Sequence, residues 1–187
     1  MAICDYSFAS IGVDCAKLPQ KGYTGRALLA KRSDITFTTV TSAPRKVLTV
    51  TAATANNIKK VDNIWANAFS GSQNTLSVEN GRPDYPKTVV VRVPNYGVDT
   101  AELVEALAKV GSVLILEKED GTYPIVGLYG KMTATEETQN ETDNGGDWLC
   151  NFNVTEPYAG VFLVADQSGS NPATAAAKFE ALWTAAA

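Results

Sequence analysis

One stretch, from Lys87 to Gly130, constrains the fold more than any other, because its pattern changes between strand and helix periods. Residues 88–93 form a β-branched run, which is typical of a strand buried on at least one face. Residues 113–116 are apolar throughout, and the Asp120-Gly121 pair is a strong signal for a two-residue hairpin turn before a strand at 123–129. The stretch therefore predicts strand, helix, strand, turn and strand in that order.

A short helix at 99–110 separates the first two of these strands. Asp99 supplies an N-cap oxygen, and Glu102 three residues later can reach back to the Asp99 N–H, as in a capping box. Gly111 is placed to end the helix in the left-handed conformation. The apolar side chains of the helix share one face, which we expect to pack on the sheet: Leu103, Val104, Leu107 and Ala108.

The rest of the chain adds mainly strands, and its first part reads as an arm. Residues 1–33 show no sustained period, so we predict an extended N-terminal arm with one short strand at 26–30. Alternating patterns predict strands at 34–41 and 46–53, joined by a turn at 42–45.

The middle of the chain is less regular. A strand near Ile58 is expected, and residues 69–86 are rich in Ser, Gly, Asn and Pro, which predicts a long connection with one short strand at 75–78. A strand at 129–135 then leads into a polar, solvent-exposed loop at 136–147.

The C-terminal part predicts two more strands and a helix. The strands are expected at 148–155, where apolar and polar residues alternate, and at 159–165. Asn171 is placed to cap a terminal helix that Pro172 begins. Three apolar side chains lie on one side of that helix: Ala176, Phe179 and Trp183.

Together these elements predict a mainly β (α+β) fold, an antiparallel β-sandwich or barrel with one flanking helix and a C-terminal helix. We expect an arm at 1–33, a sandwich or barrel domain at 34–165 that contains helix 99–110, and a C-terminal helical extension at 166–187. The chain has 187 residues, of which 45% are apolar and 19% charged, which is ordinary for one folded domain. No run approaches the roughly 18 apolar residues of a membrane-spanning helix, and the N-terminus lacks the pattern of a secretory signal.

Charge is unevenly distributed along the chain. Residues 1–60 carry nine Lys or Arg against three Asp, a balance of +6, whereas the remainder has a balance of −10. Two ordinary solvated faces would account for this distribution. It also fits a protein whose positive surface meets the negative surface of another copy, which favours head-to-tail assembly.

Few residues offer chemistry. The chain has no histidine, so histidine-based catalysis and metal binding are excluded, and it has neither of the common glycine-rich nucleotide loops. The acidic loop at 136–147 lacks the ligand spacing of an EF-hand, so we read it as a solvated loop. We therefore expect no catalytic residues, no cofactor, no metal and no enzymatic activity. Three tryptophans are expected to anchor a core or an interface: Trp65, Trp148 and Trp183.

The three cysteines, Cys4, Cys15 and Cys150, form no CxxC pair. An odd number without such a pair argues against a disulfide framework and a zinc site, and it fits synthesis in a reducing compartment. Buried thiols are expected, although the sequence leaves a Cys4–Cys15 bridge open.

The order of elements from Lys87 to about Tyr158 carries a resemblance. It comprises the strand KTVVVRVP, a capped helix, the hairpin VLILEKEDGTYPIVGLYGKM, a polar loop and the strand DWLCNFNVTEP. This order resembles the tail tube (major tail) proteins of long-tailed bacteriophages and the related tube proteins of contractile injection systems.

The resemblance implies two packed β-sheets with a helix alongside, in a virion structural protein of the phage tail that is made in the bacterial host cytoplasm. It implies homo-oligomeric rings, hexameric in that family, which stack head to tail, join other virion proteins and let DNA pass without specific binding. Acidic residues would then line the lumen, drawn from Glu117, Glu119, Asp120 and the loop at 136–147.

Other functions stay open at this point. The chain is also compatible with another phage component, such as a neck ring, head-tail adaptor or capsid decoration. A monomeric bacterial β-sandwich module that binds carbohydrate or protein is a third interpretation. An enzyme would have to use the thiols of Cys15 or Cys150, or the acidic loop.

Overall fold

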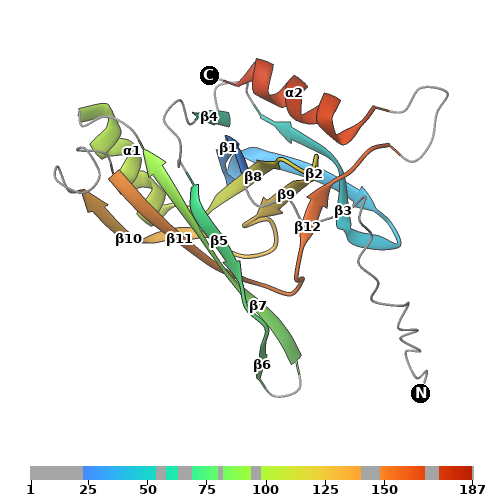
Figure 1. The fold of residues 1–187 in the computed structure, drawn as a ribbon, viewed down its shortest axis with the longest axis horizontal. Coiled ribbons are helices and arrows are strands. Elements are labelled where there is room, and N and C mark those ends of the chain that lie inside the picture. Colours follow the sequence, from blue (N-terminus) through green and yellow to red (C-terminus); the bar gives the residue numbers. More distant parts are fainter. Residues whose placement is uncertain are drawn as a thin grey trace.

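The computed structural model describes residues 23–53, 58–62, 69–79, 82–93, 98–139, 148–166 and 173–186, which fold into two β-sheets and two α-helices (Figure 1). The prediction of a mainly β, α+β fold is confirmed. A curled seven-stranded sheet has the order β2-β3-β12-β9-β8-β1-β4, and all its pairs are antiparallel except β3 with β12. Its strands are β1 (Tyr23–Lys31), β2 (Ile35–Val40), β3 (Ala43–Ala52), β4 (Ile58–Asp62), β8 (Ser112–Lys118), β9 (Tyr123–Val126) and β12 (Val161–Leu163).

The second sheet has the order β10-β11-β7-β5 along its main path, and its pairs are antiparallel. Its strands are β5 (Phe69–Asn74), β7 (Arg82–Val93), β10 (Thr133–Gln139) and β11 (Trp148–Glu156). A short strand, β6 (Ser77–Glu79), pairs only with the first part of β7. The β6–β7 hairpin projects away from the body of the molecule (Figure 1).

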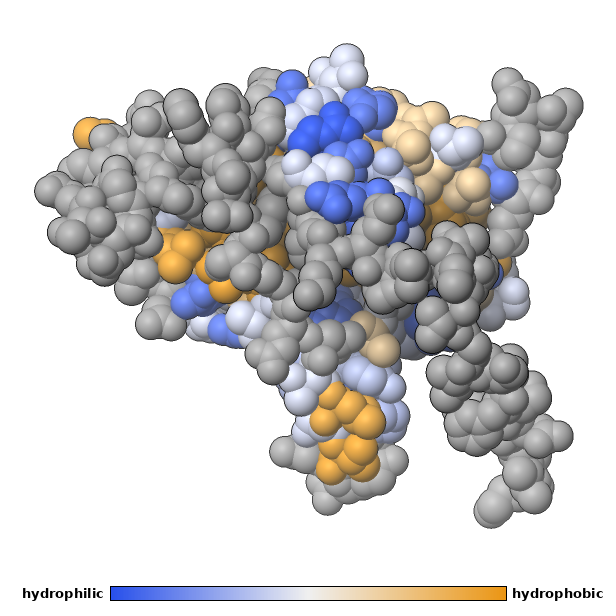
Figure 2. All heavy atoms as spheres, in the orientation of Figure 1, coloured by the Kyte–Doolittle hydropathy of each residue, from blue (hydrophilic) through white to orange (hydrophobic). Residues whose placement is uncertain are grey.

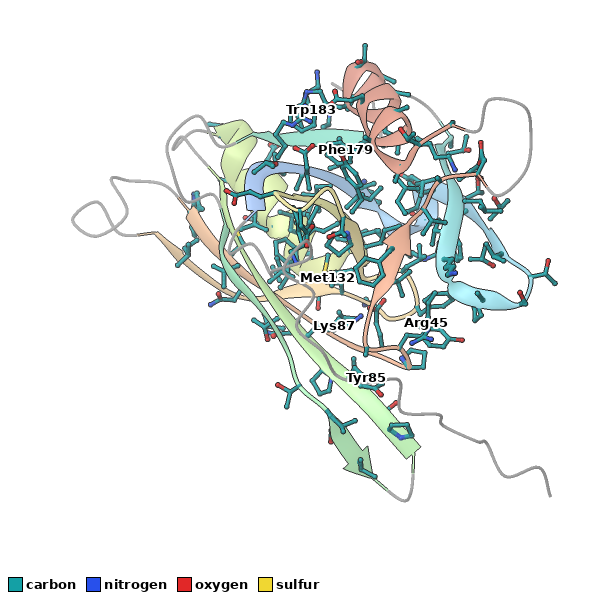
Figure 3. The ribbon with its side chains drawn as sticks, turned by 45° about the vertical axis from the view of Figure 1, so that its right-hand side comes forward. Arg45, Tyr85, Lys87, Met132, Phe179 and Trp183 are labelled. Carbon is teal, nitrogen blue, oxygen red and sulfur yellow. The ribbon has the colours of Figure 1, made fainter. Side chains whose placement is uncertain are left out.

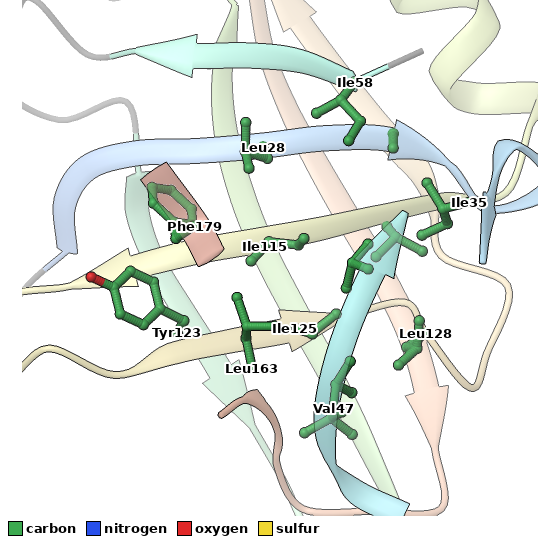
Figure 4. Close-up of a cluster of buried hydrophobic side chains, with 14 of the residues drawn as sticks. Leu28, Ile35, Val47, Ile58, Ile115, Tyr123, Ile125, Leu128, Leu163 and Phe179 are labelled. Atoms are coloured by element: carbon green, nitrogen blue, oxygen red, sulfur yellow. The ribbon is translucent and has the colours of Figure 1, made fainter. Parts of the chain in front are cut away.

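Strand β8 joins two hydrophobic cores, because its side chains alternate between them. Leu114 and Leu116 belong to a core between the two sheets, with residues of β7 and β11 such as Val91 and Phe152. Side chains of β8 on the opposite face, with Leu28 of β1, line a second core inside the curl of the seven-stranded sheet (Figure 4). Because β8 is buried on both faces, its sequence is apolar at every position from 113 to 116.

Each helix closes part of this structure. Helix α1 (Val98–Lys109) packs beside β10 and contributes Leu107 to the core between the sheets. Helix α2 (Ala175–Ala185) lies over the open side of the curled sheet and places Phe179, which is fully buried, into the second core (Figures 1 and 4). The C-terminal helix is therefore part of the fold's core.

Several predicted boundaries were wrong. The strand predicted at 26–30 is present and longer, as β1, but it is an inner strand between β8 and β4 and not part of an arm, so the arm predicted at 1–33 ends too late. A 3₁₀ turn follows at Arg32–Asp34. Residues 1–22 lie outside the described residues. The short strand predicted at 75–78 is present as β6, but the connection predicted at 69–86 also contains β5 and the start of β7, because pairing with β7 overrides the weak strand propensity of Ser, Gly and Pro.

The turns differ in detail from the prediction. Lys118 N donates to Thr122 O at 3.0 Å, so the β8–β9 loop has three residues, with Gly121 at φ +74°, rather than two. Strand β9 ends at Val126 and does not continue through 129–135, because Gly127 (φ +87°) turns the chain from the seven-stranded sheet toward β10.

The helix signals were also partly wrong. Helix α1 starts one residue earlier than predicted, so Asp99 lies inside it rather than at the N-cap. Gly111 is not left-handed, because its carbonyl accepts from Arg32 N at 2.8 Å as the chain enters β8 directly. Thr174 rather than Asn171 caps α2, its Oγ1 accepting from Ala177 N at 3.1 Å. Asn171 and Pro172 lie outside the described residues, as do residues 140–147 of the loop predicted at 136–147. The first four residues of that predicted loop are instead the end of β10, because they pair with β11.

Candidate functional site

Within the described residues, no three His, Cys, Asp or Glu side chains gather closely enough to hold a metal ion. None of the described helices is both long and apolar enough to cross a bilayer. Cys150 is fully buried in the core between the sheets, whereas Cys4 and Cys15 lie outside the described ranges.

A polar cluster around Arg26 anchors helix α2 to the curled sheet. The Arg26 guanidinium of β1 donates to both carboxylate oxygens of Glu117 on β8, at 2.7 and 2.8 Å, and also contacts Glu180 of α2. It stacks over the rings of Phe179 and Trp183, 5.4 and 5.0 Å from their centroids. The cluster therefore ties two strands and the helix together.

The same cluster fixes the charge of Glu117. Hydrogen bonds from Arg26, then from the Thr24 hydroxyl at 2.5 Å, hold the pKa of the Glu117 carboxyl below its usual value despite burial. Burial and the Glu117 charge raise the pKa of the Tyr123 hydroxyl, which donates to Glu117. Glu117 is only 8% exposed, so it is not one of the surface acids that could line a lumen. Glu119 and Asp120 are exposed at the β8–β9 turn.

A second anchor of α2 is Lys178. Its ammonium donates to the carbonyls of Leu48 on β3 and Val164 after β12, at 2.7 and 2.8 Å, and to the Asp166 carboxylate at 2.6 Å. This hydrogen bond lowers the pKa of Asp166. Three acceptors satisfy all three ammonium protons, so this lysine holds the helix in one register on the sheet.

The most deeply buried charges form an ion pair between two neighbouring strands of the second sheet. Lys87 Nζ of β7 lies 2.6 Å from Glu156 Oε2 of β11, and the two side chains are 6% and 0% exposed (Figure 3). The other carboxylate oxygen of Glu156 accepts from Tyr129 N at 3.0 Å. Both charges are buried and paired with each other, so the pair stabilises the fold and is out of reach of a substrate.

The first surface feature that offers a contact is the β6–β7 hairpin, which projects from the body of the molecule. Leu76 and Val78 on it are 60% and 61% exposed, although both are apolar (Figure 2). Pro83, which pairs with Val78 across the hairpin, is also exposed. An isolated two-stranded hairpin is marginally stable in water, so an exposed apolar one is typical of a contact surface.

The second feature is a groove of about 770 Å³ beside β12. Phe162 of β12, which is 40% exposed, lies in it with Leu163 and several alanine and glycine residues. Two exposed cations of β3, Arg45 and Lys46, also line it (Figure 3 labels Arg45). The groove is therefore apolar with positive charge at one side.

The third feature is the set of open sheet edges. Within the described part of the chain, β2 and β4 end the seven-stranded sheet, and β5 and β10 end the main path of the five-stranded sheet. Edge strands present unpaired N–H and C=O groups and readily pair with another chain.

No site residues were predicted from the sequence. The exposed apolar residues of these surfaces were not identified: Leu76, Val78 and Phe162. The only signal for the first two was the short apolar pattern at 75–78 inside a polar stretch. Phe162 lies in an apolar run that predicts a buried strand. Burial alternates along β12, so the Phe162 side chain is exposed while its two neighbours are buried. No family model, curated protein or solved structure matches this chain.

Proposed function

We propose that the chain is a virion structural protein of the tail-tube kind, which assembles into rings that stack into a conduit for DNA. The resemblance at Lys87–Tyr158 motivates the proposal, and the two packed sheets with helix α1 alongside have the architecture that the resemblance implies. The protein acts in this role by its surfaces, without a catalytic group or cofactor.

The single observation that carries the proposal is the projecting hairpin with its two exposed apolar side chains, Leu76 and Val78. Their exposure removes the stabilisation of roughly 1.5–3 kcal/mol that burial gives each such side chain. A partner that covers the hairpin recovers this free energy. Self-assembly supplies that partner in every copy.

Lateral contacts would use the open edges of the two sheets. Pairing of an edge strand such as β4 or β5 with an edge of the next subunit satisfies its unpaired backbone groups and extends the sheet around a ring. A ring of such heterologous contacts closes at a fixed number of subunits, six in the family that the chain resembles. The net negative charge of −4 would keep DNA from sticking to the conduit.

The partners that this function implies are further copies of the chain and other virion proteins, with DNA passing through. The protein would reside in the phage tail after synthesis in the bacterial cytoplasm. The neck ring, adaptor and capsid-decoration roles use the same surfaces and differ in symmetry and in stacking.

Negative-stain electron microscopy tests the proposal, with a light-scattering mass measured on the same sample. We expect rings or tubes with a central hole, whose symmetry separates a tube from an adaptor. A single peak at the monomer mass at every concentration, with no rings after addition of preformed seeds, would overturn it.

The groove beside β12 favours a second candidate, a monomeric β-sandwich module that binds a carbohydrate or a protein. Its volume of about 770 Å³ lies in the range of roughly 300–1,000 Å³ that ligand pockets occupy. Such a module would remain monomeric, and its ligand would protect Phe162 from solvent.

A further inference from the structure

We infer that the N-terminal segment, residues 1–22, docks in the groove beside β12 of its own chain and covers Phe162. The segment lies outside the described residues. Its place at the groove follows from where it joins the fold, from its apolar side chains and from its charge. The docking goes beyond the proposed function and does not depend on assembly of copies.

The segment joins the fold next to the groove. Strand β1 begins at Tyr23, which pairs with Lys118 at the end of β8. On the other side of β8, Thr122 accepts a hydrogen bond from Lys118 N at 3.0 Å and lines the groove with Gly121. Two strand spacings, roughly 10 Å, therefore separate the start of β1 from the groove. A segment of 22 residues spans that distance easily, since each extended residue adds up to about 3.3 Å.

The groove and the segment are both apolar. The groove holds the Phe162 ring, which is 40% exposed, among small residues such as Ala43 and Gly160. The first half of the segment carries five large apolar side chains: Ile3, Tyr6, Phe8, Ile11 and Val13. Contact between the two removes apolar area from water on both sides.

The groove and the segment also carry opposite charges. Arg45 and Lys46 line the groove and are exposed, and within the described residues neither has an ion-pair partner. Residues 1–16 contain two aspartates, Asp5 and Asp14, and no Lys or Arg. Acids that flank an apolar stretch are complementary to an apolar groove with cations at one side.

Attachment to the same chain favours this occupant over a separate molecule. A short tether gives the segment an effective concentration on the order of millimolar at the groove, so a contact too weak to hold a separate partner is occupied within one chain. An outside ligand of the groove would first have to displace the segment. The docking therefore regulates access to Phe162.

Photo-cross-linking of the full chain tests the docking directly. Phe162 is replaced by photoreactive benzoylphenylalanine, Phe162→Bpa, which keeps an aromatic ring in the groove. After irradiation at low protein concentration, we expect an adduct of monomer mass that maps by mass spectrometry to residues 1–16, with the same yield per chain after further dilution. The matched control places the same probe at Val98 of α1, which is 76% exposed, and we expect no adduct at 1–16 from it.

A charge exchange shows whether the acids direct the docking. Asp5→Lys with Asp14→Lys, made in the Phe162→Bpa chain, is expected to reduce the adduct about tenfold, because like charges then meet. Arg45→Glu with Lys46→Glu is expected to do the same. The chain that carries all four changes has opposite charges again and should recover the adduct. The thermal midpoint should stay as in the parent chain, since Arg45 and Lys46 are exposed.

The outcomes separate the inference from the proposed function. An adduct of dimer mass whose yield falls on dilution, or no adduct at 1–16, would overturn the inference. A yield that neither charge reversal lowers would also overturn it, because random collisions of a tethered segment give such an adduct. Electron microscopy of the same chain decides the proposed function separately. Rings without the monomer adduct leave that function standing, and the adduct without rings keeps the docking and overturns the tube.

Discussion

Gly127 is a position where both the backbone conformation and the available space require glycine. Its φ of +87° lies in the left-handed region, and a Cβ there would meet Ser112 O at 2.4 Å and Met132 Cβ at 2.8 Å. Both constraints arise because the chain leaves β9 here and crosses beside the start of β8, where Ser112 N donates to Met132 O. Gly121 shares the positive φ but has no atom within 4 Å of such a Cβ.

Alanine at these two glycines should therefore have unequal effects. We expect Gly121→Ala to lower the free energy of unfolding by about 1–2 kcal/mol, the cost of a left-handed residue. Gly127→Ala adds a clash with backbone and should cost at least about 3 kcal/mol. Urea unfolding of both variants measures the difference, and equal losses would contradict this account of Gly127.

The buried Lys87–Glu156 pair gives a second prediction at this scale. Glu156→Gln removes the charge that Lys87 faces and leaves a buried ammonium without its counter-ion, so we expect a loss of about 3–5 kcal/mol. The double variant Lys87→Met with Glu156→Leu leaves no buried charge and should lose less than the single variant. A double variant that is less stable than Glu156→Gln would show that the Tyr129 N–H contact matters more than the charge.

At the scale of elements, helix α2 depends on the sheet far more than on its own sequence. It is alanine-rich and short, but its one fully buried side chain, Phe179, packs 5.0 Å from the Tyr123 ring and stacks with Trp183. Two ionic contacts, Arg26 with Glu180 and Lys178 with Asp166, tie it to β1 and to the segment after β12. Short isolated helices are marginal in water, so these contacts decide whether it forms.

Removal of the Phe179 ring should therefore undock the helix. We expect Phe179→Ala to lower the free energy of unfolding by about 3–5 kcal/mol. It should also increase hydrogen exchange of the α2 amides before the rest of the chain exchanges. Ala176→Ser, on the exposed side of the same helix, should change stability by less than about 0.5 kcal/mol. Exchange of α2 at the wild-type rate in Phe179→Ala would contradict this role.

The Glu117 anchor predicts how this element responds to acid. The pKa of Glu117 is depressed, chiefly by the hydrogen bonds from Arg26, below its ordinary value of 4.5. A carboxyl with a lowered folded-state pKa contributes stability that is present above the unfolded pKa and is lost as pH falls through the folded pKa. Below about pH 4.5 the wild type should therefore lose stability more steeply than Glu117→Gln.

Chemical unfolding at a series of pH values measures this difference. The comparison isolates Glu117, because Asp120 and Asp166, whose pKa values are also lowered, are present in both proteins. Parallel pH profiles for the wild type and Glu117→Gln would show that the Arg26 pairing adds no acid sensitivity.

At the scale of the whole molecule, the two cores are joined through shared strands. Successive residues of β8 and of β1 point alternately into the core between the sheets and the core under α2. Because the backbone of β8 and β1 forms one side of both cores, neither core can unfold while the other stays folded. The molecule should therefore unfold as one cooperative unit.

Tryptophan fluorescence tests this cooperativity. Trp148 packs against the core between the sheets and Trp183 against the core under α2. Variants that retain only Trp148 or only Trp183, with Trp65 also replaced, should give coincident urea transitions. Ile115 belongs only to the core under α2. Ile115→Ala should lower the free energy of unfolding by about 2–5 kcal/mol, and both tryptophan signals should report the same loss. A shift in the Trp183 signal alone would show that the cores unfold separately.

The sequence by itself determined most of the elements, because their signals are local. The continuous apolar run at 113–116, the alternation at 148–155 and the Asp120-Gly121 turn each appear where they were predicted, with a longer turn at the last. These patterns follow from burial on one or both faces of a strand, which a single chain segment records.

Only the tertiary structure decided the rest. It made residues 23–31 an inner strand and residues 69–74 an edge strand, because hydrogen bonds to distant partners, β8 and β7, outweigh their weak local preference. It paired Lys87 with Glu156 and Arg26 with Glu117 across 69 and 91 residues of sequence. It also left Leu76, Val78 and Phe162 exposed, since exposure depends on what the folded chain brings near each side chain and not on the side chain itself.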